Sequence, residues 1–98
     1  MKPSAALFTF GGYLNQDFDR YGSRLEDIIR GALLDMQPAA RRNLLREIDG
    51  WLEAGVSSAE LEDMFRQTPA DMYVTGDASQ FYRTIRDAIV AIEGERRW

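Results

Sequence analysis

Hydrophobic residues recur along this chain at the spacing of amphipathic helices. Between residues 25 and 36 they fall at intervals of three and four, which gathers them on one helical face. Similar stripes lie at 44–52 and 81–92. We therefore expect helices from Ser23 to Gln37, from Pro38 to Ala54 and over the C-terminal stretch. The stripe positions are Leu25, Ile28, Ile29, Ala32, Leu33 and Met36; then Leu44, Leu45, Ile48, Trp51 and Leu52; then Phe81, Tyr82, Ile85, Ala88, Ile89 and Ile92.

Short motifs mark the ends of these helices. Ser23–Glu26 and Ser57–Glu60 each match a capping box, in which the serine accepts a free backbone N–H and the glutamate reaches back. Pro38 suits a first helical turn, and Gly55 suits a left-handed C-terminal cap. The second capping box therefore predicts a short fourth helix, whose inward residues are Leu61, Met64 and Phe65.

The chain after this short helix is the most irregular part of the sequence. Thr68–Pro69 should end the helix because the residue before a proline avoids the helical region. We expect Ala70–Ala78 to be irregular, with an extended conformation open to Met72–Val74, and Asp77 or Ser79 to cap the last helix. Residues 1–98 thus predict a single all-α domain of four or five helices around one core.

The segment Phe8–Gly22 combines aromatic residues with glycines, which neither a solvated loop nor an ordinary amphipathic helix would do. We interpret it as a buried aromatic plug that ends in an acidic turn, with a short helix within Pro3–Leu14. Gly11 and Gly12 indicate close packing or a helix end, since no phosphate-binding motif surrounds them. The aromatic residues are Phe8, Phe10, Tyr13, Phe18 and Tyr21.

Composition excludes several kinds of chemistry. The chain has no cysteine and no histidine, so disulfides, thiolate zinc sites and histidine general bases are excluded. Asp17–Gly22 begins like a calcium loop, but Ile28 stands where the bidentate glutamate should be. We expect no enzymatic activity, no metal and no cofactor. Apolar runs are too short for a membrane span and no signal sequence is evident, so we expect a cytoplasmic protein.

The charge is concentrated in the middle of the chain. The net charge is −4, but residues 47–77 carry −7, whereas residues 1–46 carry +2 and residues 78–98 carry +1. Arg41, Arg42 and Arg46 are interpreted as a solvated helix face. The acidic balance argues against direct binding of nucleic acid.

Several motifs resemble the small helical immunity proteins of contact-dependent growth inhibition and related polymorphic toxin systems. The most specific is Gly11–Asp19, continued by Tyr21–Ser23; later landmarks are Leu45–Asp49 and Ser57–Leu61. The family commonly has His where this chain has Asn15, so a titrating ring is not expected to act there. The resemblance implies a helical fold and a protein partner, the cognate toxin domain, bound as a 1:1 heterodimer.

If that toxin is a nuclease, as is common in such systems, its substrate site is positive and the acidic segment could occupy it in place of phosphates. Glu62 is a weaker candidate because Arg66, four residues on, can pair with it. The toxin-binding candidates are Glu60 and Asp63 on the outer face of the short helix, then Asp71, Tyr73 and Asp77, then Asp17 and Asp19.

Two alternatives remain open. Asp17 and Asp19 could cap their own turn or pair with Arg20 or Arg24 instead of meeting a partner. The whole chain could also be a helical adaptor or a homo-oligomer that has no toxin partner.

Overall fold

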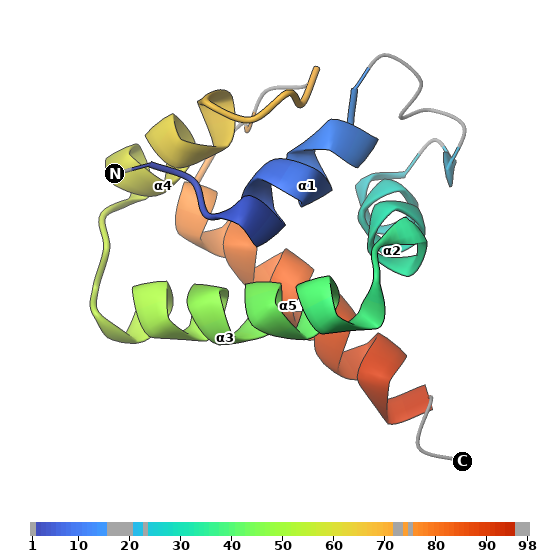
Figure 1. Cartoon of the computed structure of the whole chain (residues 1–98). Helices are drawn as coiled ribbons and strands as arrows, with labels where there is room; N and C mark the ends of the chain where they lie inside the picture. Colours follow the sequence, from blue (N-terminus) through green and yellow to red (C-terminus); the bar gives the residue numbers. More distant parts are fainter. Residues whose placement is uncertain (1, 16–20, 23, 72–73, 75, 96–98) are drawn as a thin grey trace.

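The described residues form five helices, which confirm the expected all-α fold (Figure 1). The computed structural model describes residues 2–15, 21–22, 24–71, 74 and 76–95. No strand occurs within these ranges. The helices are α1 (Ala5–Tyr13), α2 (Leu25–Asp35), α3 (Pro38–Glu53), α4 (Ser58–Arg66) and α5 (Ala78–Glu95).

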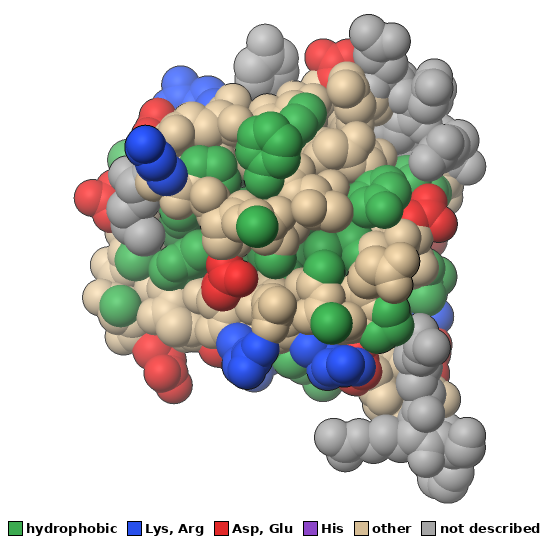
Figure 2. Space-filling view, in the orientation of Figure 1, with side chains coloured by type: hydrophobic (Ala, Val, Ile, Leu, Met, Phe, Trp, Pro, Cys, Tyr) green, Lys and Arg blue, Asp and Glu red, His purple; other side chains and the backbone are tan. Residues whose placement is uncertain are grey.

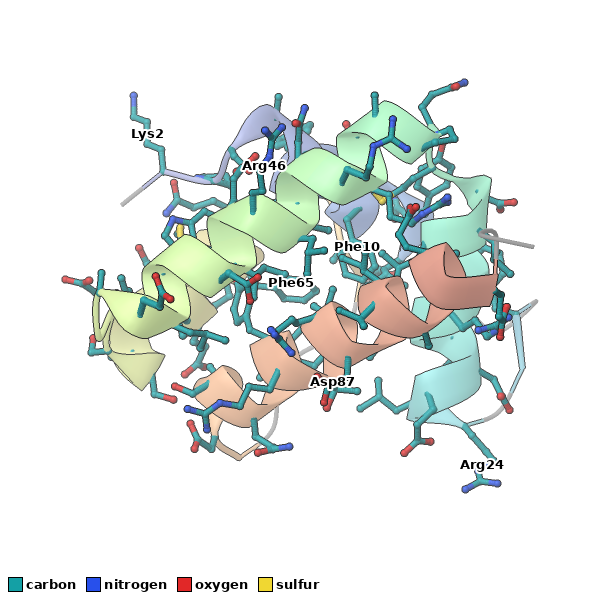
Figure 3. The ribbon with its side chains drawn as sticks, turned by 90° about the horizontal axis from the view of Figure 1, so that it is seen from below. Lys2, Phe10, Arg24, Arg46, Phe65 and Asp87 are labelled. Atoms are coloured by element: carbon teal, nitrogen blue, oxygen red, sulfur yellow. The ribbon has the colours of Figure 1, made fainter. Side chains whose placement is uncertain are left out.

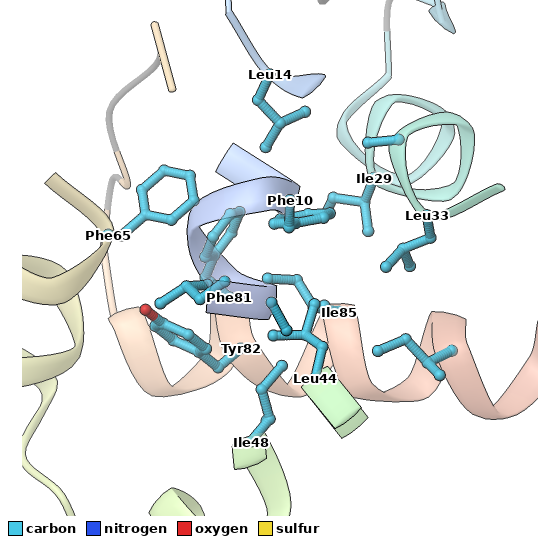
Figure 4. Packing of buried hydrophobic residues seen from close by; sticks show 14 of the residues in the cluster. Phe10, Leu14, Ile29, Leu33, Leu44, Ile48, Phe65, Phe81, Tyr82 and Ile85 are labelled. Atoms are coloured by element: carbon cyan, nitrogen blue, oxygen red, sulfur yellow. The ribbon is translucent and has the colours of Figure 1, made fainter. Parts of the chain in front are cut away.

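Two helices, α1 and α5, organise the packing. Each of them contacts α2, α3 and α4. Figure 4 shows the centre of the core, where Phe10 of α1 lies among side chains from the other four helices. Phe10 and the neighbouring Leu7 and Leu14 are fully buried. The opening segment therefore supplies part of the core, as the plug interpretation expected.

The predicted stripes of α3, α4 and α5 face the core. Phe65 meets Phe81 edge to face, with 5.1 Å between the ring centroids. Trp51 meets Tyr82 in the same manner at 6.0 Å. The Tyr82 hydroxyl donates to the carbonyl oxygen of Leu61 at 3.0 Å, which satisfies the only polar atom that this buried side chain brings into the core.

Two hydrophobic residues were wrongly expected to be buried. Phe8 is 49% exposed, because it lies about 200° around the helix from Phe10 and one narrow helix cannot bury both. Leu25 is 41% exposed although it lies near the middle of its stripe, because it is the first residue of α2. Tyr13 and Tyr21 pack against the core from partly buried positions, and Phe18 lies outside the described residues.

The helix ends agree with the sequence in most places. The Ser57 hydroxyl accepts the backbone N–H of Glu60 at 3.2 Å, as a capping box requires. Gly55 has the expected positive φ of 71°. Asp77, rather than Ser79, caps α5, because an Asp77 carboxylate oxygen accepts the Ser79 N–H at 3.0 Å. The other expected capping serine, Ser23, lies outside the described residues, and α4 ends at Arg66, before the proline motif.

Gly11 is where α1 approaches the end of α4. A methyl group on Gly11 would overlap the side chain of Thr68. The Thr68 hydroxyl in turn donates to the Phe65 carbonyl at 2.6 Å. Close by, the Asp71 N–H donates to the Leu14 carbonyl at 2.9 Å. Gly11 therefore has the close-packing role that the sequence suggested.

Candidate functional site

The acidic segment 47–77 runs from the second half of α3 through all of α4 to the residue before α5. Its carboxylates therefore lie on several elements and not on one face. Some of them pair with cations or cap helices, and these contacts lower their availability to a partner.

Glu60 and Asp63 are brought together on the exposed side of α4. Three residues apart, they are neighbours on the helix surface, opposite the buried Leu61. Asp63 accepts a hydrogen bond from the Gln67 side chain at 3.1 Å. Arg66 lies 4.0 Å from the Asp63 carboxylate, so the ion pair expected between Arg66 and Glu62 is replaced by one with Asp63.

Asp77 has a structural role that the sequence only partly revealed. One carboxylate oxygen accepts the hydroxyl of Ser58 at 2.5 Å as well as the Ser79 N–H. These bonds, that from Ser58 first, hold the pKa of the Asp77 carboxyl below its ordinary value. Asp77 therefore ties the beginning of α4 to the beginning of α5. The missing signal was the proximity of Ser58, which lies nineteen positions earlier in the chain.

The remaining candidates are separated from the α4 pair. Asp71 is exposed in the segment after α4, and its backbone is bonded to the end of α1. Tyr73, Asp17 and Asp19 lie outside the described residues, so their proposed contacts stay predictions.

Arg41 was wrongly interpreted as part of a solvated face. Its side chain is 0% exposed, whereas Arg42 and Arg46 are exposed as expected. The Arg41 guanidinium donates to Glu93 of α5 at 3.1 Å and to the Leu33 carbonyl of α2 at 2.9 Å. The signal was present in the sequence, because Arg41 precedes Leu44 by three positions and so lies on the buried stripe of α3.

The sequence did not predict the charged cleft that lies between α3 and α5. It has a volume of about 410 Å³, and Figure 3 shows the two helices side by side from this side of the molecule. Asp49, expected on a solvent face, is half-buried there and accepts a hydrogen bond from Arg86 at 2.5 Å. Arg86 also donates to Asp87 at 3.1 Å. The cleft is lined by Asp49, Leu52, Glu53, Arg83, Arg86 and Asp87.

These contacts have a clear electrostatic consequence. The bond to Asp49, followed by the bond to Asp87, raises the pKa of Arg86 above its ordinary value. Arg86 therefore stays charged and is held at the α3 side of the cleft. Among the described residues, Glu53 makes no ion pair within 4.0 Å.

The described part of the chain offers no metal site, since no group of three or more Asp or Glu side chains there could hold an ion. The carboxylates of the incomplete calcium motif lie outside it. None of the described helices is both long and apolar enough to span a membrane.

Comparison with known proteins gives one match. No curated protein and no solved structure matches this chain. A family model described as the CdiI immunity protein matches residues 7–89, which run from α1 through most of α5 and include the whole acidic segment. This match covers far more than half of the chain, and it agrees with the all-α fold expected for the family that the opening motif resembles. The chain therefore belongs to the CdiI immunity protein family.

Proposed function

We propose that this protein binds and neutralises the C-terminal toxin domain of a contact-dependent growth inhibition effector, as a 1:1 heterodimer in the cytoplasm. The observation that carries the proposal is membership of the immunity family over residues 7–89. The chain contains no histidine or cysteine for nucleophilic catalysis. Neutralisation by binding alone is therefore the mechanism that its chemistry favours.

The acidic segment supports a nuclease as the toxin, with an RNase such as a tRNase as the first candidate. A nuclease must hold phosphates with Lys and Arg side chains, and an acidic partner can occupy or border that surface. Glu60 and Asp63 are exposed together on α4, and Asp71 is exposed beyond it. Asp77, which caps α5, would contribute mainly by holding α4 in place.

The test uses the toxin domain encoded by the effector gene directly upstream of this one. We expect the two proteins to copurify, and we expect the immunity protein to restore growth of cells that express the toxin domain. Isothermal titration calorimetry should give one site per chain. A well-folded toxin domain that neither binds nor is inhibited would overturn the proposal.

Charge reversal on α4 tests which surface binds. The variant Glu60→Lys with Asp63→Lys should weaken binding and slow association, because electrostatic steering is lost. The matched control is Arg42→Glu with Arg46→Glu on α3, where both side chains are exposed. Stopped-flow mixing at two salt concentrations separates the effect on the association rate from the effect on dissociation. The two variants change the net charge by +4 and −4, so an effect of overall charge alone would give opposite results. Equal effects from both variants, or none from the first, would move the binding surface away from α4.

One observation favours the second candidate, a homo-oligomer or adaptor. The outer side of α1 is uncharged and carries the half-exposed ring of Phe8. Figure 2 shows hydrophobic side chains on the face that carries α1, with arginine side chains along the edge formed by α3. Light scattering after gel filtration separates the candidates, because an oligomer would have a multiple of the 11.2 kDa chain mass without any toxin.

A further inference from the structure

Two clefts flank α5, and Asp87 stands between them. The first is the charged cleft on the α3 side. The second, about 350 Å³, lies between α5 and α2 and is lined by Glu26, Ile29, Arg30, Thr84, Asp87 and Ala88. Asp87 lines both clefts and projects from the outer side of α5, as Figure 3 shows.

The two clefts differ in chemistry. The cleft on the α2 side is lined by the partly buried Ala88 above the fully buried Ile29, and Arg30 in its lining pairs with Glu95 at 2.6 Å. In the cleft on the α3 side, Asp49 holds Arg86 at 2.5 Å. One cleft is therefore suited to an apolar side chain and the other to an ionic one.

The charges on the α3 side favour a cation. The lining holds three carboxylates against two arginines, Arg83 and Arg86, which gives a net charge of −1, and Arg86 is held there by Asp49. The positive charge of Arg83 acts on Asp77, at the N-terminal end of α5. Asp49 and one oxygen of Asp87 both bond Arg86, which leaves the Glu53 carboxylate and the other Asp87 oxygen to meet an incoming positive group.

We propose that the toxin domain docks across α5, with an arginine or lysine between Glu53 and Asp87 and an apolar side chain in the cleft beside α2. The inference rests on the proposed function and names the surface that performs it. It is continuous with the acidic segment, because Asp49 and Glu53 belong to that segment. Interfaces draw most of their binding energy from side chains that fill such pockets, with charged groups at the rim.

Neutralising the two carboxylates tests the ionic half. Glu53→Gln with Asp87→Asn preserves side-chain size, and Asp49 still holds Arg86. We expect titration calorimetry with the toxin domain to show binding weakened at least about 30-fold, as for the loss of one partner of a desolvated charge pair. The control is Glu47→Gln, which removes one carboxylate charge from α3 about 240° around that helix from Glu53. It should change the dissociation constant by less than about threefold.

The absence of native cysteine provides a second measurement. A single thiol introduced by Asp87→Cys, or by Ala88→Cys in the cleft beside α2, can be labelled with a maleimide in the free and bound states. We expect the toxin domain to slow labelling at both positions at least about tenfold and to leave Glu47→Cys unaffected. This labelling measurement does not depend on the stability of the Glu53→Gln, Asp87→Asn variant, because each cysteine variant changes a single side chain. Circular dichroism checks that each cysteine variant is folded.

The outcomes separate this inference from the function on which it rests. Loss of affinity in the cleft variant together with protection at both thiols supports docking across α5. Tight binding of the cleft variant with free labelling in the complex overturns it, while the toxin-binding function stands and the surface moves to Glu60 and Asp63 on α4. Failure of the unmodified protein to bind the toxin domain overturns both.

Discussion

The buried ion pair between Arg41 and Glu93 predicts an asymmetric response to mutation. The Arg41 side chain is 0% exposed, but the Glu93 side chain is 24% exposed. Glu93→Ala leaves a buried guanidinium without its carboxylate, which should cost about 3–5 kcal/mol of unfolding free energy. Arg41→Met leaves Glu93 able to turn toward water and removes a buried charge. Its main cost is the lost hydrogen bond to the Leu33 carbonyl, which still accepts the Met36 N–H, so the net loss should stay below about 2 kcal/mol.

Urea unfolding followed by far-ultraviolet circular dichroism measures this difference. The matched control is Glu95→Ala, two residues further along α5, which removes the exposed ion pair with Arg30 and should cost at most about 1 kcal/mol. For a domain of this size, Glu93→Ala should also lower the melting temperature by more than about 12 °C. A larger loss of unfolding free energy for Arg41→Met than for Glu93→Ala would refute the reasoning. Arg41 would then stabilise the fold through its packing and hydrogen bonds, and an unpaired buried guanidinium would not be the larger cost.

Three further predictions follow from single positions. Phe10→Ala should cost about 3–5 kcal/mol because the ring is fully buried, whereas Phe8→Ala should cost less than about 1 kcal/mol in the same urea assay. Gly12→Ala should stabilise the protein by about 0.5–1 kcal/mol because nothing lies within 4 Å of the added methyl group, whereas Gly11→Ala should destabilise it through overlap with a neighbouring side chain. The pKa of Asp77 is lowered in the folded state, so ionised Asp77 stabilises the fold above the ordinary carboxyl pKa of about 3.9. This stabilisation is lost as the pH falls through the pKa of the folded state. The difference in unfolding free energy between wild type and Asp77→Asn should therefore be largest near pH 7 and should shrink at low pH.

The fold could be predicted because local rules specify most of it. Each helix from α2 to α5 has a stripe at the helical period, and the breaks at Pro38 and Gly55 have direct conformational causes. The opening helix is different, since α1 contains no charged residue and its buried side could not be distinguished from its exposed side. That is why Phe8 was placed in the core alongside Phe10.

The candidate site could be predicted only in part, because its defining contacts join distant positions. Glu60 and Asp63 are neighbours along one helix, so their shared exposure followed from the sequence. Arg86 and Asp49 are 37 positions apart, and no helical period relates them. A charge count places the acidic segment in the chain but cannot distinguish a carboxylate held by an arginine from one that is open to a partner.

The two sides of α5 explain why a partner could bind without disturbing the core. Its inner side carries Tyr82 and Ile85 into contact with the other helices, whereas Asp87 projects outward from the same helix. The inner side fixes the position of the helix, so a side chain on its outer side loses little conformational entropy when a partner binds. The loss of that entropy is a large part of what limits binding affinity. Substitutions at Asp87 should therefore report on contacts with the partner, whereas substitutions at Arg41, which joins α2, α3 and α5, should report on the stability of the support beneath them.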